Sequence, residues 1–143
     1  MKRRFAAVVV FTIAFAAGYS AAQSREDAAR TIQANLLAAK ERQEKRPTMD
    51  PALFSGDPYV ESAYRAAKEF PEALDKMFCY CYCSINPDFK HKSLLTCYVD
   101  GHAAKCGVCM REGVLSKQMT AEGKTPAQIA KYFADFYQDK REH

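Results

Sequence analysis

Apolar side chains recur every three or four residues along most of this 143-residue chain, which is the spacing of one face of an α-helix. No stretch shows the strict alternation of apolar and polar residues that predicts a half-buried strand. We therefore expect an all-α protein, a small bundle of about four to five helices with a cysteine-rich loop between helices.

Two helices are expected before the cysteine-rich part of the chain. The first covers residues 23–46, where Ser24–Arg46 is rich in Ala, Glu, Lys, Arg and Gln, lacks Gly and Pro, and has one narrow apolar face. The second begins at Pro58 with Asp57 as its N-cap, and its inward-facing residues are Val60, Tyr64, Ala67 and Phe70. Between them, residues 47–57 contain prolines and a glycine and are expected to form a linker or an extended crossover.

Residues 58–143 are expected to form the cysteine-rich helical domain. Pro71 cannot sit deep in a helix, so it either kinks the second helix or starts a short one that continues through Met77. Further helices are expected over Lys92–Val99 and His102–Ala121, ended by a glycine in each case. The last helix starts at Thr125-Pro126, and its predicted buried residues are Ile129, Tyr132, Phe133 and Phe136.

Residues 1–22 have the pattern of a signal peptide. Three basic residues precede an apolar run, and Ser20-Ala21-Ala22 offers small side chains for cleavage before Gln23. The competing interpretation is an uncleaved membrane anchor, because the apolar run is close to the ~17–25 residues that span a bilayer. We expect export to the periplasm or the medium, with a membrane contact only if the leader is retained.

The net charge of the mature chain argues against nucleic acid as a partner. Removal of Lys2, Arg3 and Arg4 lowers the 21 basic residues to 18, against 17 acidic residues, so the mature protein is nearly neutral. Phosphate binding needs a clustered cationic face, and none is evident in the sequence.

All six cysteines lie between Cys79 and Cys109. The run Cys79-Tyr80-Cys81-Tyr82-Cys83 is expected to be a loop, Cys97 follows, and Cys106 and Cys109 form a C-x-x-C pair. His91 and His102 lie among them. Sulfur and imidazole ligands in this concentration favour a soft metal ion or a dithiol redox site.

The type of ligand also restricts the metal. Asp88 and Asp100 are the acidic residues of this stretch, so calcium and magnesium are disfavoured. Cu(I) is the favoured ion, because it accepts two or three thiolates and because six sulfurs exceed the four that one tetrahedral zinc uses. Zinc remains an alternative, an iron–sulfur cluster is disfavoured by the C-x-C-x-C spacing, and covalent haem is disfavoured because Met110 follows the C-x-x-C pair.

The expected helix over His102–Ala121 would place His102, Cys106 and Cys109 on one face, closing against the cysteine loop, with Cys97 arriving from the preceding helix. His91 is six residues from Cys97 and is expected to lie off its face. Met77 and Met110 could add thioethers but are interpreted as core residues. The predicted metal ligands are Cys79, Cys81, Cys83, Cys97, Cys106, Cys109 and His102.

Two other classes of function fit the same cysteines. An even number of cysteines in an exported protein is compatible with three disulfides and a stapled interaction domain. A C-x-x-C pair on a helix is also typical of thiol–disulfide redox proteins, although the expected helix places Cys106 about a turn from its start, away from the activating N-terminus. Possible partners are thus the metal ion itself and a metallochaperone or redox protein.

These motifs make the chain resemble the bacterial family named for its CYCxC, or PCYCGC, motif, some of whose members are described as selenoproteins. The resemblance extends from Asp57-Pro58 through the last helix and rests on residues 79–83, 91–97 and 102–109. Phe78 stands where proline is frequent in the family, and Tyr82 where glycine is common. The resemblance implies an exported protein, often a lipoprotein in this family, without an established activity. Selenium in relatives would suit both metal capture and redox exchange.

Overall fold

The computed structural model describes residues 26, 30, 43–84 and 86–139. The chain divides into two compact units, residues 1–31 and 32–143. In the first unit, Glu26 and Arg30 are helical and form an i, i+4 ion pair of 3.7 Å. The predicted signal peptide and most of the predicted N-terminal helix lie outside the described residues.

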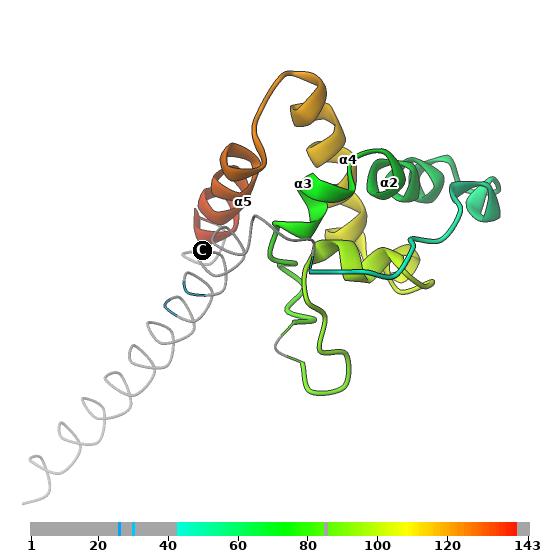
Figure 1. Cartoon of the computed structure of the whole chain (residues 1–143), viewed down its shortest axis with the longest axis horizontal. Helices are drawn as coiled ribbons and strands as arrows, with labels where there is room; N and C mark the ends of the chain where they lie inside the picture. The colour runs from blue at the N-terminus through cyan, green and yellow to red at the C-terminus, as the bar shows by residue number, and fades with distance from the viewer. Residues whose placement is uncertain (1–25, 27–29, 31–42, 85, 140–143) are drawn as a thin grey trace, which may run out of the picture. The chain divides into compact units, whose positions relative to one another are not determined.

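The described residues of the second unit form helices and no strand, which confirms the all-α class (Figure 1). The elements, in chain order, are the 3-10 helix η2 (Pro51–Phe54), the α-helices α2 (Pro58–Glu69) and α3 (Pro71–Asp75), the 3-10 helices η3 (Leu94–Tyr98) and η4 (Ala103–Lys105), and the α-helices α4 (Gly107–Ala121) and α5 (Pro126–Asp139). Helix α4 contacts α2, α3 and α5. No helix of the described part is both long and apolar enough to cross a bilayer.

Helix α2 begins as the sequence predicts. The Asp57 carboxylate accepts hydrogen bonds from Tyr59 N (3.0 Å) and Val60 N (3.2 Å), and Pro58 occupies the first helical position. Pro71 starts the short helix α3, so the second of its two predicted roles is the one observed.

Helices α4 and α5 are separated by a turn that the sequence also predicts. Gly123 has a φ of 81°, a conformation that glycine adopts without steric cost, and α4 ends just before it. Thr125 and Gln128 then form a reciprocal capping pair, in which Thr125 N donates to Gln128 Oε1 (2.8 Å) and Gln128 N donates to Thr125 Oγ1 (3.3 Å).

The buried face of α5 is rotated from the predicted one. Ile129 and Phe133 are buried as expected, but Tyr132 is 41% exposed. Ala130 is buried in its place, and Tyr137 packs against the core. Because α5 contacts both α3 and α4, its buried residues are Ile129, Ala130 and Phe133, with Tyr137 packed beside them, and Tyr132 is on the exposed side.

The predicted helix over His102–Ala121 is wrong in its first turn. Residues 103–105 form the separate 3-10 turn η4, and Cys106 is the extended N-cap of α4, with φ −128° and ψ 105°. Tertiary hydrogen bonds hold the turn apart from the helix. The Tyr64 hydroxyl donates to Asp100 O (2.6 Å) and accepts from Ala104 N (3.3 Å).

The helix predicted over Lys92–Val99 is the shorter 3-10 helix η3, and residues 43–46, predicted as the end of a helix, are not helical. A buried polar network explains both differences. The Asp75 carboxylate accepts from Gln43 N (2.5 Å), Glu44 N (3.1 Å) and Ser93 Oγ (2.7 Å). The buried Glu44 carboxylate accepts from Thr96 Oγ1 (2.9 Å) and pairs with Arg46 (2.8 Å). These hydrogen bonds of Asp75 and Glu44 replace the backbone hydrogen bonds that a longer α-helix would make in the two segments.

The core is organised around two tyrosines. Tyr64 from α2 and Tyr98 from η3 are fully buried and meet edge to face, with ring centroids 5.1 Å apart. The Tyr98 hydroxyl donates to Cys109 O (2.6 Å) on α4. A Cβ atom at Gly113 would collide with this hydroxyl, so glycine is required for the close approach of Tyr98 to α4.

We predict that Gly113→Ala destabilises the protein by roughly 1–2 kcal/mol. Overpacking costs about 1–3 kcal/mol, and the higher helix propensity of alanine offsets part of this destabilisation. Gly107→Ala, where nothing lies within 4 Å of the added methyl, is the matched control on the same helix. Urea unfolding measures both. Combining Tyr98→Phe with Gly113→Ala should show favourable coupling, and additive effects of the two changes would contradict the close approach.

The hydrogen bonds of Glu44 should make the free energy of unfolding depend on pH at acidic pH. Hydrogen bonding from Arg46 lowers the pKa of Glu44 from 4.5 to about 2. The ionised Glu44 carboxylate therefore contributes fully to the free energy of unfolding above the unfolded-state pKa, and this contribution is lost as the pH falls toward 2. Because Arg46 is 60% exposed, we expect this contribution to be only roughly 1–3 kcal/mol. The difference in unfolding free energy between the wild type and Glu44→Gln should shrink from about pH 5 to about pH 2. The surface variant Glu61→Gln is the control, and a pH-independent difference for Glu44→Gln would refute the assignment.

Candidate metal centre

The loop from Cys79 to Cys83 folds so that its three sulfurs lie together. Tyr82 N donates to Cys79 O (2.9 Å), and Tyr82 itself has a φ of 64°, which non-glycine residues rarely adopt. In an extended strand, alternate residues would project in one direction but stay well separated. The turn instead brings Cys81 Sγ to 2.9 Å from both Cys79 Sγ and Cys83 Sγ.

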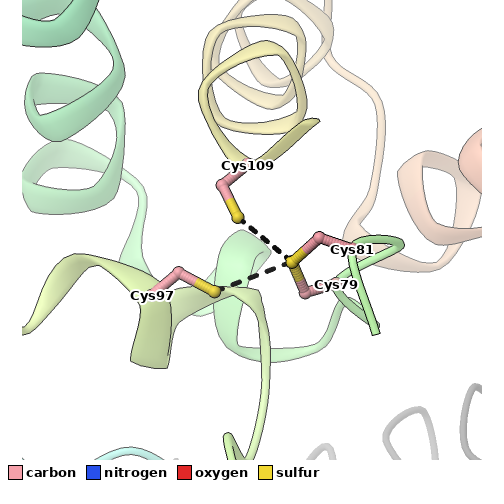
Figure 2. A group of neighbouring side chains, drawn as sticks. All are labelled: Cys79, Cys81, Cys97 and Cys109. Atoms are coloured by element: carbon pink, nitrogen blue, oxygen red, sulfur yellow. Dashed lines mark hydrogen bonds between the residues drawn. The ribbon is translucent and has the colours of Figure 1, made fainter. Parts of the chain in front are cut away.

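Two other segments bring sulfurs to the same place. Cys109, the third residue of α4, has its sulfur 3.3 Å from Cys79 Sγ and 3.4 Å from Cys81 Sγ. Cys97 in η3 has its sulfur 3.6 Å from Cys79 Sγ. Figure 2 shows these side chains pointing toward one another from the loop, η3 and α4. The four sulfurs lie within 4.8 Å of one another, and we call Cys79, Cys81, Cys97 and Cys109 the inner group.

A second group of ligand atoms overlaps the first. The imidazole Nε2 of His102 lies 3.1 Å from Cys83 Sγ. This nitrogen and the sulfurs of Cys81, Cys83 and Cys97 also lie within 4.8 Å of one another, and we call these four residues the outer group. Cys81 and Cys97 belong to both groups.

The prediction for His91 is wrong. Its side chain is buried, and its Nδ1 lies 3.1 Å from Cys97 Sγ. We predicted this position from the spacing of a regular helix through both residues. Instead, residues 91–93 precede the 3-10 helix η3, and His91 N donates to Cys83 O (3.2 Å). Burial lowers the pKa of His91, which favours the neutral imidazole that donates or binds a metal through one nitrogen.

Cys106 occupies a different position from the one predicted. It is half-buried at the N-cap of α4, outside both groups of converging ligands, and does not share a helical face with His102. Its side chain lines a surface pocket of about 550 Å³. The other residues of that pocket are Phe89, Asp100, Gly101, His102 and Lys105.

Met77 and Met110 are predicted to be core residues, and their packing agrees with that role. Met77 is buried, and its sulfur accepts a hydrogen bond from Ser116 Oγ (3.6 Å), in agreement with a role in the core. Met110 is partly buried and packs against the core.

The thiols titrate very unequally because they hydrogen-bond to one another. Bonds with Cys109 and then with Cys79 lower the pKa of Cys81. A bond with Cys79 also lowers the pKa of Cys83, whereas bonds with Cys109 raise the pKa of both Cys79 and Cys97. Ionisation is therefore favoured at Cys81 and Cys83 over Cys79 and Cys97.

Glu112 is a buried residue of the site that the sequence analysis did not identify. It lies three residues after Cys109 on α4, so helical spacing could have placed it on the same face. Its Oε1 accepts from Tyr80 N (3.2 Å), and burial raises the pKa of this carboxyl group. Tyr80 stacks on Tyr137 of α5 with ring centroids 4.4 Å apart, so α5 helps to cover the cysteine loop.

This arrangement has the composition and spacing of a soft-metal site. All six cysteines are free thiols, not disulfides. Four sulfurs bound to one ion at ~2.3 Å would lie roughly 3.8 Å apart, so the contacts of the inner group would need to widen by less than about 1 Å. The thiolate-rich ligand set is suited to soft ions rather than to calcium or magnesium.

The chain matches a protein family defined by its cysteine motif. A model described as "Protein of unknown function with PCYCGC motif" matches residues 7–142, so the chain belongs to this family. No curated protein and no solved structure matches it. The motif PCYCGC has glycine where this chain has Tyr82, and the positive φ of Tyr82 gives a physical reason for that glycine, because glycine adopts such a conformation without steric cost.

Proposed function

We propose that this protein is exported and binds a soft metal ion, most specifically Cu(I), for storage, delivery or detoxification. The observation that carries the proposal is the inner group, in which four free thiols from three chain segments converge within 4.8 Å. Cu(I) is preferred because it is stabilised by two or three thiolates, and this group offers a choice of four.

Burial of the ligands supports retention of the ion. Cys79, Cys97 and Cys109 are each no more than 1% exposed, so a bound ion would be shielded from water and from competing thiols. No carboxylate belongs to the inner group, and the nearby Glu112 carboxyl has a raised pKa that favours its neutral form. Export is supported by the leader pattern of residues 1–22.

The first test is metal binding by reduced protein. The full chain is expressed with its leader and purified anaerobically, and its intact mass shows whether residues 1–22 have been removed. Cu(I) is then titrated in competition with a Cu(I) chelator, with Zn(II) added as a competitor. We expect tight Cu(I) binding that Zn(II) does not displace.

Substitution of an inner ligand should weaken this binding strongly. Cys79→Ser and Cys109→Ser should each lower Cu(I) affinity beyond the ~10–100-fold that loss of an outer-shell partner costs. Cys106→Ser is the matched control, because Cys106 lies in the same stretch but outside both groups. Failure of the wild type to retain Cu(I), or equal effects of all three substitutions, would refute the proposed site.

A thiol–disulfide redox function is the second candidate, and the position of Cys106 favours it. Cys106 is half-buried at the N-cap of α4, and Cys109 is buried at its third residue, the arrangement found in redox C-x-x-C sites. It ranks second because burial raises the pKa of the Cys106 thiol, whereas an attacking cysteine is usually made more acidic.

The redox candidate predicts a Cys106–Cys109 disulfide with a reduction potential above the roughly −300 mV limit of structural disulfides. Equilibration with glutathione measures the potential, and turnover of insulin disulfides measures activity. Cys106→Ser should abolish turnover. Background turnover by the wild type, or a potential below that limit, would exclude this function and leave metal binding as the only candidate of the two.

A further inference from the structure

We propose that the centre holds two metal ions at once, one in the inner group and one in the outer group, with the thiolates of Cys81 and Cys97 bridging both. This inference rests on the proposed metal-binding function and goes beyond it in the number of ions and in the role of each ligand. It assigns terminal ligands to each ion. Cys79 and Cys109 bind the inner ion alone, whereas Cys83 and His102 bind the outer ion alone.

The overlap of the two groups is the geometric basis of this arrangement. Each group brings four ligand atoms within 4.8 Å, and the sulfurs of Cys81 and Cys97 are common to the two. A thiolate sulfur has more than one free lone pair and can bind two ions. Two separate four-ligand sites would need eight side chains, whereas sharing two sulfurs reduces the requirement to the six residues that are present in these groups.

The charge of the cluster also favours a second cation. The five cysteines of the two groups would carry five negative charges as thiolates, so one Cu(I) ion would leave a net charge of −4 and a second would lower it to −3. In the described residues, the hydrogen-bond partners of these five sulfurs are other thiols, two imidazoles and, for Cys79, the Glu112 carboxyl, with no lysine or arginine. Since uncompensated buried charge is costly, a second ion stabilises the fully deprotonated ligand set.

The two ions differ in access to solvent. The terminal ligands of the inner ion are buried, with Cys79 at 1% and Cys109 at 0% exposure. In the outer group Cys83 is also buried, at 5% exposure, but His102 is half-buried and lines the open surface pocket beside Cys106 and Lys105. Phe89 packs edge to face on the His102 ring, with centroids 4.6 Å apart, and is itself 48% exposed. The outer ion is therefore the one that exchanges with solution.

The stoichiometry of Cu(I) tests the number of ions. Reduced full-length protein is titrated anaerobically with Cu(I), and bound ions are counted by native mass spectrometry. We expect two ions for the wild type and for Cys106→Ser, and one ion for Cys83→Ser and for His102→Asn. Circular dichroism and thermal unfolding verify that each variant folds, and the two outer-group variants test the same ion independently.

The outcomes distinguish this inference from the proposed function. A wild type that binds one Cu(I) overturns the two-ion centre and leaves the proposed function intact, whereas a wild type that binds none overturns both. Any stoichiometry above two, or two ions retained by both Cys83→Ser and His102→Asn, also overturns the assignment of the outer ion.

Co(II) tests the shared sulfurs. Bridging thiolates couple the electron spins of two Co(II) ions, so the paramagnetic resonance signal should grow with the first equivalent and fall with the second. A signal that grows in proportion through both equivalents would show that the ions share no sulfur. A chelator challenge should remove one Cu(I) ion faster than the other from the wild type, and loss of both at one rate would overturn the assignment of the outer ion as the exchangeable one.

Discussion

The sulfur cluster depends on the contact of one tyrosine with one helix. Tyr98 follows Cys97 directly, and its hydroxyl donates to the backbone carbonyl of Cys109. This hydrogen bond fixes the position of η3 relative to the start of α4, and it therefore sets the sulfurs of Cys97 and Cys109 opposite each other. The approach is possible because Gly113 leaves the space that the hydroxyl occupies. A residue in the core and a glycine on a helix thus determine the geometry of ligands that neither of them provides.

Three buried carboxyl groups lie around the cluster without belonging to either ligand group. Glu44 and Asp75 are buried, but their carboxylates are occupied by hydrogen bonds that hold residues 43–46 against Ser93 and Thr96, next to Cys97. Glu112 lies closer to the loop, and burial raises the pKa of its carboxyl group. The carboxyl groups therefore support the loops that carry sulfur, while the converging ligand atoms are thiols and imidazole.

Concentration of thiols in a buried site has an electrostatic consequence. Hydrogen bonds within the cluster lower the pKa values of Cys81 and Cys83 and raise those of Cys79 and Cys97. A bound cation favours ionisation of every thiol that it contacts, because it replaces the shared protons as the partner of each sulfur. The arrangement that limits the charge of the metal-free protein is thus the one that a soft cation can occupy.

The sequence alone determined the all-α class, the caps at Asp57 and Thr125 and the glycine stop at Gly123, because these depend on neighbours within a few residues. It also indicated the family, through the motifs of residues 79–83, 91–97 and 102–109. It also placed the chemistry in the stretch from Cys79 to Cys109. The tertiary structure decided that Cys106 is outside both ligand groups, that His91 contacts Cys97, and that residues 102–105 are not part of the helix. Those outcomes arise in turns without a helical period, and they are fixed by hydrogen bonds such as Tyr64 to Asp100, 36 residues apart in sequence. Local patterns contain no information on such long-range bonds.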